Sequence, residues 1–195
     1  MWDERYAAEE YIYGTEPNDF LKTHFQHLPK GKILCLADGE GRNSVFLAEQ
    51  GYDVTAVDSS TMGIKKAQKL AKQRGVEIET HIEDLAKFDL GNNQWEGIVS
   101  IFCHLPPALR QHVHAQIPHA LKPKGVFLLE SYRPEQLAYK TGGPQIAEMT
   151  ISLDNLTNEI QGLNCLMGQE IERNVTEGSL HTGLAAVTQF IAQKG

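Results

Sequence analysis

Short apolar runs alternate with helical stretches along most of this chain, and this alternation constrains the fold more than any other feature. The apolar runs are residues 32–37, 53–57, 76–81, 95–102 and 125–131. Strands that helices cover on both sheet faces have nearly continuous apolar sequences of this length. Strands alternating with helices are typical of parallel strands joined by right-handed crossovers. The chain is therefore predicted to be α/β with a doubly wound, mostly parallel sheet.

Glycines end two of the predicted helices. Residues 44–50 are expected to form a helix that Gly51 closes, and residues 62–74 a second helix that stops at Gly75. Glycine suits both positions because it takes the left-handed conformation after a helix at little cost.

Prolines mark a third helix. Pro106 and Pro107 are well placed in a first helical turn, where their missing N–H groups are not needed. Pro118 falls inside the same stretch and removes a backbone donor, so we expect a kink or break near Ile117.

The two ends of the chain differ from this middle part. Residues 163–174 and 184–193 are strand-like runs separated by a short loop, so they should pair antiparallel. The full prediction is a seven-stranded sheet with an antiparallel last strand. Residues 6–25 predict one or two short helices with a turn, either a lid or a packed extension.

Composition limits the classes of protein and partner. With 195 residues and 41% apolar content, one domain is expected. A net charge of −7 without a Lys/Arg run argues against nucleic acid as partner, and residues 65–74 are read as a solvated helix face. No apolar window is long enough to span a membrane and no leader pattern opens the chain, so a cytoplasmic location is expected. The three cysteines form no CxxC pair, and no metal site is expected.

A glycine-rich turn, residues 38–41, follows the first predicted strand and leads into a helix. Such a turn presents free backbone N–H groups and the positive helix end to a ligand. Asp58 ends the next strand nineteen positions after Gly39, close to the spacing at which a carboxylate meets ribose hydroxyls. This pair fits NAD, flavin or S-adenosylmethionine. Asp38 and Glu40 would repel a pyrophosphate, so the turn favours S-adenosylmethionine, which carries an ammonium and a sulfonium.

These motifs resemble those of the class I S-adenosylmethionine-dependent methyltransferases. Residues 33–43 resemble the family's first motif, 57–60 the ribose-binding second and 81–85 the adenine-binding third. Residues 98–104 resemble the fourth motif, and 121–125 the turn before the fifth strand. The resemblance covers residues 30–131.

Shorter segments are similar to the tellurite-resistance (TehB-like) and thiol methyltransferase branch. They are residues 3–6, 13–14, 17–18, 41–43 and 141–144.

Two positions depart from the family pattern. Cys35 stands where the family often has an acid, and Ala37 replaces the first glycine of the turn. Asp38 and Glu40 are the candidates to supply the acidic function.

The resemblance implies roles for individual residues. Gly39 and Gly41 would let the cofactor approach the backbone, Asp58 would accept hydrogen bonds from the ribose, and Asp84 with the Leu85 backbone would read the adenine. Helix or turn capping is the alternative for both aspartates. Arg42 and Asn43 would hold the methionine carboxylate or cap the helix. The predicted cofactor-binding residues are Tyr13, Ala37, Asp38, Gly39, Glu40, Gly41, Arg42, Asn43, Asp58, Ser59, Met62, Glu83, Asp84, Leu85 and Phe102.

Acceptor-side residues should follow the later strands, since ligands bind at the carboxyl ends of parallel strands. His104, Tyr132 and Arg133 are the predicted catalytic residues, and residues 132–144 are expected to line the acceptor cavity. A thiol or selenol acceptor needs only a nearby positive or hydrogen-bonding group, whereas an amine or hydroxyl acceptor needs proton removal. His104 is read as an orienting group or base, with a surface or capping role as the alternative, and Arg133 as an attractor of anions or an exposed side chain.

The sequence therefore predicts an enzyme that transfers methyl groups from S-adenosylmethionine to a small molecule, such as a thiol or a tellurite- or selenite-type oxyanion. Residues 1–195 are expected to form one domain, with a lid or extension at 1–30, a cofactor-binding core at 31–131, and an acceptor-side segment with a hairpin at 132–195. The alternatives are a non-catalytic S-adenosylmethionine-binding regulatory domain and, with less support, an NAD-dependent oxidoreductase.

Overall fold

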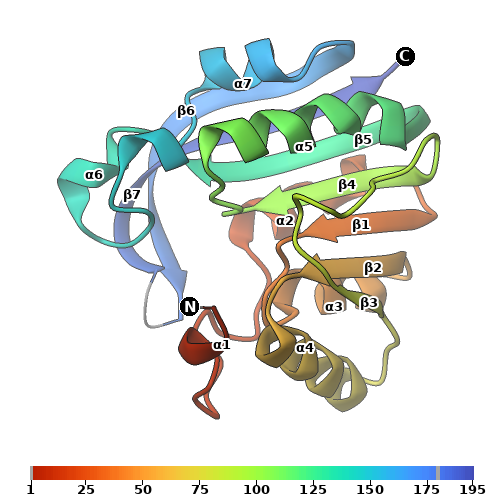
Figure 1. The fold of residues 1–195 in the computed structure, drawn as a ribbon, viewed down its shortest axis with the longest axis vertical. Helices are drawn as coiled ribbons and strands as arrows, with labels where there is room; N and C mark the ends of the chain where they lie inside the picture. The colour runs from red at the N-terminus through yellow and green to blue at the C-terminus, as the bar shows by residue number, and fades with distance from the viewer. Residues whose placement is uncertain (1, 179–180) are drawn as a thin grey trace.

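The computed structural model describes residues 2–178 and 181–195, which form a single seven-stranded sheet with helices on both faces (Figure 1). The strand order is β3-β2-β1-β4-β5-β7-β6. The strands are β1 (Lys32–Leu36), β2 (Asp53–Asp58), β3 (Glu79–Ile82), β4 (Trp95–Ile101), β5 (Leu121–Tyr132), β6 (Leu163–Glu177) and β7 (His181–Lys194). β1 to β5 pair parallel, and β7 runs antiparallel to both β5 and β6. The predicted fold class is confirmed.

The α-helices are α1 (Trp2–Arg5), α2 (Asp19–His24), α3 (Arg42–Glu49), α4 (Thr61–Arg74), α5 (Pro107–Ala120), α6 (Gln136–Tyr139) and α7 (Leu153–Glu159). Two single 3-10 turns, η1 (Phe25–His27) and η2 (Ala147–Met149), complete the set. The predicted helices are present as α2, α3, α4 and α5, whereas α1, α6 and α7 were not predicted. Gly51 and Gly75 have φ angles of 82° and 70°, as expected of glycines that follow a helix.

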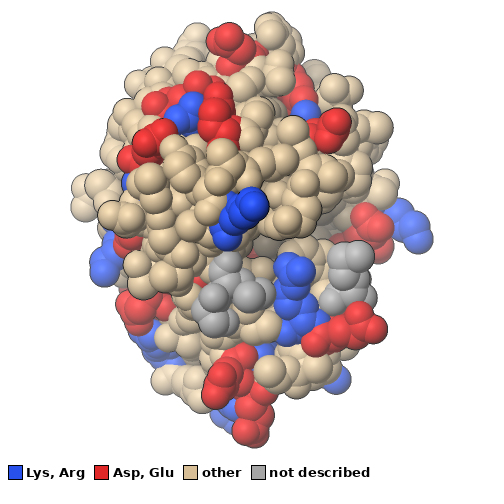
Figure 2. Space-filling model, turned by 90° about the vertical axis from the view of Figure 1, so that its left-hand side faces the viewer, with Lys and Arg blue, Asp and Glu red and all other residues tan. Residues whose placement is uncertain are grey.

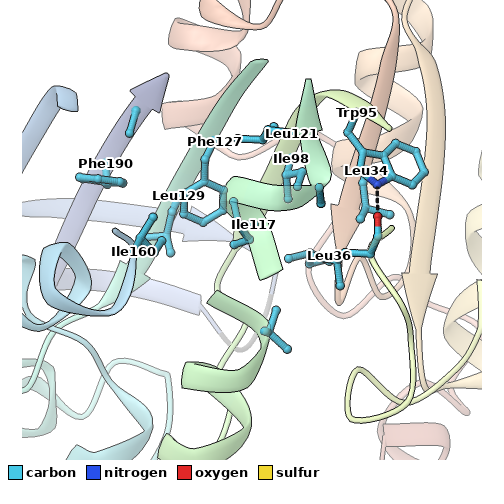
Figure 3. Packing of buried hydrophobic residues seen from close by; sticks show 14 of the residues in the cluster. Leu34, Leu36, Trp95, Ile98, Ile117, Leu121, Phe127, Leu129, Ile160 and Phe190 are labelled. Carbon is cyan, nitrogen blue, oxygen red and sulfur yellow. Dashed lines mark hydrogen bonds between the residues drawn. The ribbon is translucent and has the colours of Figure 1, made fainter. Parts of the chain in front are cut away.

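The core has two layers because alternate side chains of each strand point to opposite sheet faces. Leu34 and Leu36 of β1 join the cluster beneath α5 and α7, whereas Ile33 and Cys35 join the cluster beneath α2 and α3. Figure 3 shows the first cluster, in which the Trp95 indole N–H donates to the Leu90 carbonyl at 2.8 Å. That hydrogen bond satisfies the one polar group of a side chain that is otherwise buried among hydrocarbon.

The predicted break near Ile117 is wrong. α5 continues through Pro118 to Ala120, and the Leu121 N–H donates to the Ile117 carbonyl across the proline. Pro118 lies in the last helical turn, where its missing N–H removes only one bond from the end of the ladder.

The third strand begins later than predicted. β3 starts at Glu79 opposite Thr55, so residues 76–78 are not paired with β2. Val76 and Ile78 instead pack against the contact between α3 and α4. Their apolar character therefore reflects helix packing and not strand formation.

The N-terminal segment agrees with the prediction of one or two short helices, since α2 lies within residues 6–25. α1 lies ahead of Tyr6, and residues 7–18 contain no helix. Several backbone N–H groups there donate to side chains of the core, including Ile12 to Glu40 and Asn18 to Asn43. These tertiary acceptors replace the carbonyls that a helix would supply. Residues 179–180, part of the loop predicted before β7, lie outside the described residues.

Candidate active site

A cavity of about 800 Å³ opens at the carboxyl ends of β1, β2 and β4. Its floor is formed by residues that follow these strands. The rest of the wall is formed by residues of the N-terminal segment, by residues 142–146, and by Met149 and His181. Both its size and its position are those of small-molecule sites in open α/β sheets.

The glycine turn carries the floor of the cavity, but its two glycines have different roles. Gly39 has a φ angle of 62° and lines the cavity, where a side chain at this position would lie 2.7 Å from the Tyr6 hydroxyl. Gly41 has a φ angle of 90° and lies outside the cavity wall. A Cβ on Gly41 would lie 2.6 Å from the Cα atom of Ala67. Gly41 therefore permits the close approach of α3 and α4.

Asp58 ends β2 with its carboxylate turned toward the glycine turn. The Gly39 N–H donates to Asp58 Oδ2 at 2.8 Å, and the Ser60 N–H donates to Oδ1 at 2.8 Å. Burial raises the pKa of Asp58, although these backbone donors oppose the shift. Each carboxylate oxygen keeps a second lone pair. Asp58 is thus oriented toward the cavity with acceptor capacity left for a ligand.

Asp38 lies beside Asp58 and is bound to the first turn of α3. Its carboxylate accepts a hydrogen bond from the Ser44 hydroxyl and one from the Ser44 N–H. Burial raises the pKa of Asp38 to about 6, with Asp58 contributing further. Asp38 therefore titrates just below neutral pH.

Glu40 has a structural role that the sequence did not indicate. One of its carboxylate oxygens accepts from the N–H groups of Ile12 (2.9 Å) and Tyr13 (3.3 Å), and the other accepts from Lys66 Nζ (2.7 Å). Its side chain is paired and buried, so Glu40 holds the N-terminal segment over the cavity. Of the two acids expected to disfavour a pyrophosphate, Asp38 is the one without a cationic partner among the described hydrogen bonds and ion pairs.

Arg42 and Asn43 line the cavity and do not cap α3. Gly41 is the N-cap residue and offers no side-chain bond. Arg42 Nη2 pairs with Glu177 at 2.6 Å, while its Nη1 atom is buried without a hydrogen-bond partner among the described residues. Asn43 Oδ1 accepts the Asn18 N–H. The orphaned Nη1 atom is available to an anionic group in the cavity.

The side of the cavity near β3 is formed by Ser59, Glu83, Asp84 and Leu85. Asp84 Oδ1 accepts the Ala86 N–H at 2.9 Å, which starts the turn after β3. The capping role considered for Asp84 is therefore present, and its side chain lines the cavity as well.

Aromatic rings form the opposite side, near β4 and β7. Phe102 stacks on Tyr132 with centroids 4.5 Å apart, and His104 stacks on Tyr132 at 5.3 Å. The His181 ring lies 4.6 Å from the Tyr13 ring. Tyr132 is buried behind these rings and is not part of the cavity wall.

His104 and His181 are the unusual groups of this side. Burial lowers the pKa of each to about 3, with His181 adding to the shift of His104, and Arg42 and Arg5 adding to that of His181. Both ring nitrogens of His104 and the Nδ1 atom of His181 are buried without a hydrogen-bond partner of ordinary geometry among the described residues. The Met149 backbone opposes the pKa shift of His104 without reversing it, so both rings are neutral at pH 7, and both line the cavity.

Four predicted site residues lie outside the cavity wall: Gly41, Met62, Tyr132 and Arg133. The Met62 N–H donates to Asp3 at the start of α4, so its backbone anchors α1. Arg133 Nη1 lies 3.3 Å from Glu135 and reaches toward the carboxylates of β6. The Arg133 guanidinium is therefore engaged with carboxylates outside the cavity wall.

The other predicted residues all line the cavity: Tyr13, Ala37, Asp38, Gly39, Glu40, Arg42, Asn43, Asp58, Ser59, Glu83, Asp84, Leu85, Phe102 and His104. Sequence reasoning missed Trp2, Tyr6, Ile146 and Met149, which lie in segments without periodic pattern. The expected cavity-lining segment, 132–144, contributes residues 142–144, and the wall continues to Met149.

The chain matches methyltransferases in sequence. Residues 33–125 match the family described as "Methyltransferase domain". The ubiquinone biosynthesis O-methyltransferase of Rickettsia canadensis is 27% identical over 127 residues, which is 63% of this chain and 51% of that protein. The chain thus spans about half the length of this curated relative.

Solved structures share the fold. A structure described as "Conversion of a Disulfide Bond into a Thioacetal Group during Echinomycin Biosynthesis" has a TM-score of 0.79 at 16% identity, covering 99% of this chain and 91% of that one. TehB from Haemophilus influenzae has a TM-score of 0.75 at 17% identity, covering 100% of this chain and 66% of that one. At these identities the likeness concerns the fold alone.

Proposed function

Because residues 33–125 match a methyltransferase domain on a class I methyltransferase fold, we propose that this protein is an S-adenosylmethionine-dependent methyltransferase. Its acceptor is a small molecule whose nucleophilic atom is a chalcogen, as in a thiol or a tellurite- or selenite-type oxyanion. The proposed tellurite-resistance-like branch rests on the short motifs at residues 3–6, 13–14, 17–18, 41–43 and 141–144.

The cavity floor fits the three parts of the cofactor, which are the ribose, the adenine and the methionine part with its ammonium and carboxylate. Asp58 has lone pairs for ribose hydroxyls, and residues 83–85 form the adenine side. Asp38 offers a carboxylate to the ammonium, and the orphaned Arg42 Nη1 atom offers a donor to the carboxylate. When bound, S-adenosylmethionine supplies a methyl carbon already attached to a positively charged sulfur, so the protein contributes mainly alignment and the exclusion of water.

The pair of neutral histidines, His104 and His181, carries the proposal for the acceptor. A histidine whose pKa is about 3 does not hold a proton near neutral pH, so it is a poor base for an amine or hydroxyl acceptor. Its ring N–H can still donate to an anionic nucleophile. The described acceptor-side lining residues, 102–106, 142–146, Met149 and His181, include no carboxylate. This side therefore suits an acceptor that ionises by itself, as a thiol does.

The transfer is an in-line displacement. The thiolate sulfur forms a bond to the methyl carbon while the bond from that carbon to the cofactor sulfonium breaks. The electron pair of the broken bond stays on the cofactor sulfur, which becomes a neutral thioether, and the thiol proton has already passed to water. His104 and His181 orient the thiolate through ring N–H groups and need not titrate.

We further propose the division of the chain stated from its sequence: a lid or extension at residues 1–30, a cofactor core at 31–131 and an acceptor side at 132–195. The anchors of the lid support it, since Asp3 accepts from Ser60 and Glu40 accepts from Tyr13. Among the described helices, none has the length and apolar character to cross a bilayer. In Figure 2, Lys and Arg side chains are dispersed among acidic and uncharged ones, which gives no support to a nucleic-acid partner on that face. The three free cysteines suit a reducing, cytoplasmic setting.

The test is methyl transfer from labelled S-adenosylmethionine to a panel of thiols, tellurite, selenite and small amines, with products identified by mass. We expect methylated chalcogen products and no methylated amines. His104→Asn and His181→Asn should lower kcat at least tenfold, whereas His112→Asn, on the exposed face of α5, should not. Binding of S-adenosylhomocysteine without transfer to any acceptor would contradict the proposal and favour a regulatory domain.

A further inference from the structure

Charge is distributed unevenly around the cavity. The charged lining residues are Arg5, Asp38, Glu40, Arg42, Asp58, Glu83 and Asp84. All of them lie on the side proposed for the cofactor or on the N-terminal segment above it. The opposite side holds the two neutral histidines and an apolar wall, defined here as Leu105, Pro106, Pro144, Ile146 and Met149. The two halves of the cavity therefore suit ligands of different polarity.

The apolar wall is partly exposed to solvent. Its residue Ile146 is 52% exposed and lines the cavity. Large apolar side chains in contact with water gain about 25 cal/mol for each Å² that a partner covers. An apolar group in this half of the cavity would cover surface that water otherwise meets.

Arg110 of α5 holds the chain on both sides of the wall residue Met149. Arg110 Nη1 donates to the carbonyls of Glu148 (2.8 Å) and Thr150 (3.2 Å), and the same guanidinium pairs with Glu159 of α7. At the start of residues 143–149, Gly143 packs so closely on the Tyr132 ring that a Cβ added to Gly143 would lie 2.5 Å from the ring. The wall is thus a preformed surface, and a ligand need not order it.

We propose that the acceptor is an organic thiol with an apolar body, which lies against the apolar wall while its sulfur faces His104 and His181. The inference rests on the proposed function and names its substrate class. Tellurite and selenite are strongly hydrated anions, and dehydrating them requires charged or multiple donors. The apolar wall offers none, so an inorganic oxyanion would leave half of the cavity without a partner.

Steady-state methyl transfer with three kinds of acceptor tests this inference. Benzenethiol represents an apolar thiol, 2-mercaptoethanol a polar thiol, and sodium tellurite the inorganic oxyanion. We expect kcat/KM for benzenethiol to exceed that for 2-mercaptoethanol at least tenfold at equal thiolate concentration, and to exceed that for tellurite by more. An equal or higher kcat/KM for either polar acceptor would refute the claim that the acceptor has an apolar body. The proposal that the protein is a methyltransferase would still stand.

Ile146→Ser tests whether the apolar wall causes the preference for an apolar thiol. We expect it to raise KM for benzenethiol about fivefold, with kcat and the Kd of S-adenosylhomocysteine unchanged. Leu166→Ser is the matched control, because Leu166 of β6 is 51% exposed and lies outside the cavity wall. Equal effects of the two substitutions, or none from Ile146→Ser, would overturn the assignment of the wall. Transfer to no acceptor by the unaltered protein would overturn the proposed function together with this inference.

Discussion

Asn18 joins the N-terminal segment to the sheet, and its replacement by alanine should cost much of the protein's stability. The residue is fully buried. Its Nδ2 atom donates to Glu130 Oε1 at 2.8 Å and to Glu177 Oε1 at 2.7 Å. Its Oδ1 atom accepts the Leu21 N–H as the N-cap of α2. The alanine variant loses all three side-chain bonds.

The magnitude follows from these bonds. A hydrogen bond to a charged group contributes about 1.5–3 kcal/mol, and an N-cap about 1 kcal/mol. Glu130 and Glu177 both keep Arg173 as an ionic partner, so we take a smaller value of about 1–2 kcal/mol for each bond, or about 2–4 kcal/mol for the two bonds together. The expected loss in the free energy of unfolding is therefore about 3–5 kcal/mol, which lowers Tm by about 6–20 °C for a chain of this size.

Urea unfolding followed by circular dichroism measures this loss. Asn18→Ser keeps a capping oxygen but loses both donors, so it should be about 1 kcal/mol more stable than Asn18→Ala. Asn158→Ala, at an exposed position of α7, should change the free energy by less than about 0.5 kcal/mol. A loss of under about 1 kcal/mol for Asn18→Ala would refute the argument that these buried carboxylates depend on the amide.

Two further predictions concern the cavity floor, and a third concerns the packing of α3 on α4. Asp58→Ala should weaken S-adenosylhomocysteine binding at least tenfold by calorimetry, whereas Asp53→Ala, at the exposed start of the same strand, should leave it unchanged. We propose that ionised Asp38 binds the ammonium of S-adenosylhomocysteine, so the affinity for this ligand should be full above the Asp38 pKa of about 6 and fall as pH drops through it. In titrations at a series of pH values, Asp38→Asn should remove this pH dependence. Gly41→Ala combines a left-handed backbone with a clash against Ala67, so its Tm should fall by about 4–16 °C for a loss of about 2–4 kcal/mol, and an unchanged Tm would contradict this packing.

The sheet and the cofactor side of the cavity were predictable because they depend on local patterns. Apolar runs of strand length, with helices between them, are enough to predict parallel strands. The turn at Gly39 and the carboxylate of Asp58 follow their strands directly, so their meeting at one sheet edge follows from strand order. The errors at Val76 and Pro118 arose where tertiary packing determined the outcome and local propensity did not.

The remaining features come from contacts between distant residues. Asn18 meets Glu177 across 159 positions of sequence, and Glu40 binds backbone that precedes it by 27 or 28. His181 and Ile146 reach the cavity from segments that follow the predicted core. No periodicity marks such residues, because a buried hydrogen bond or an apolar wall depends on which surfaces folding brings together. The sequence alone therefore determined the sheet and the turn with Asp58 at its edge, whereas the anchoring of the N-terminal segment and the apolar wall of the cavity were decided by the tertiary structure.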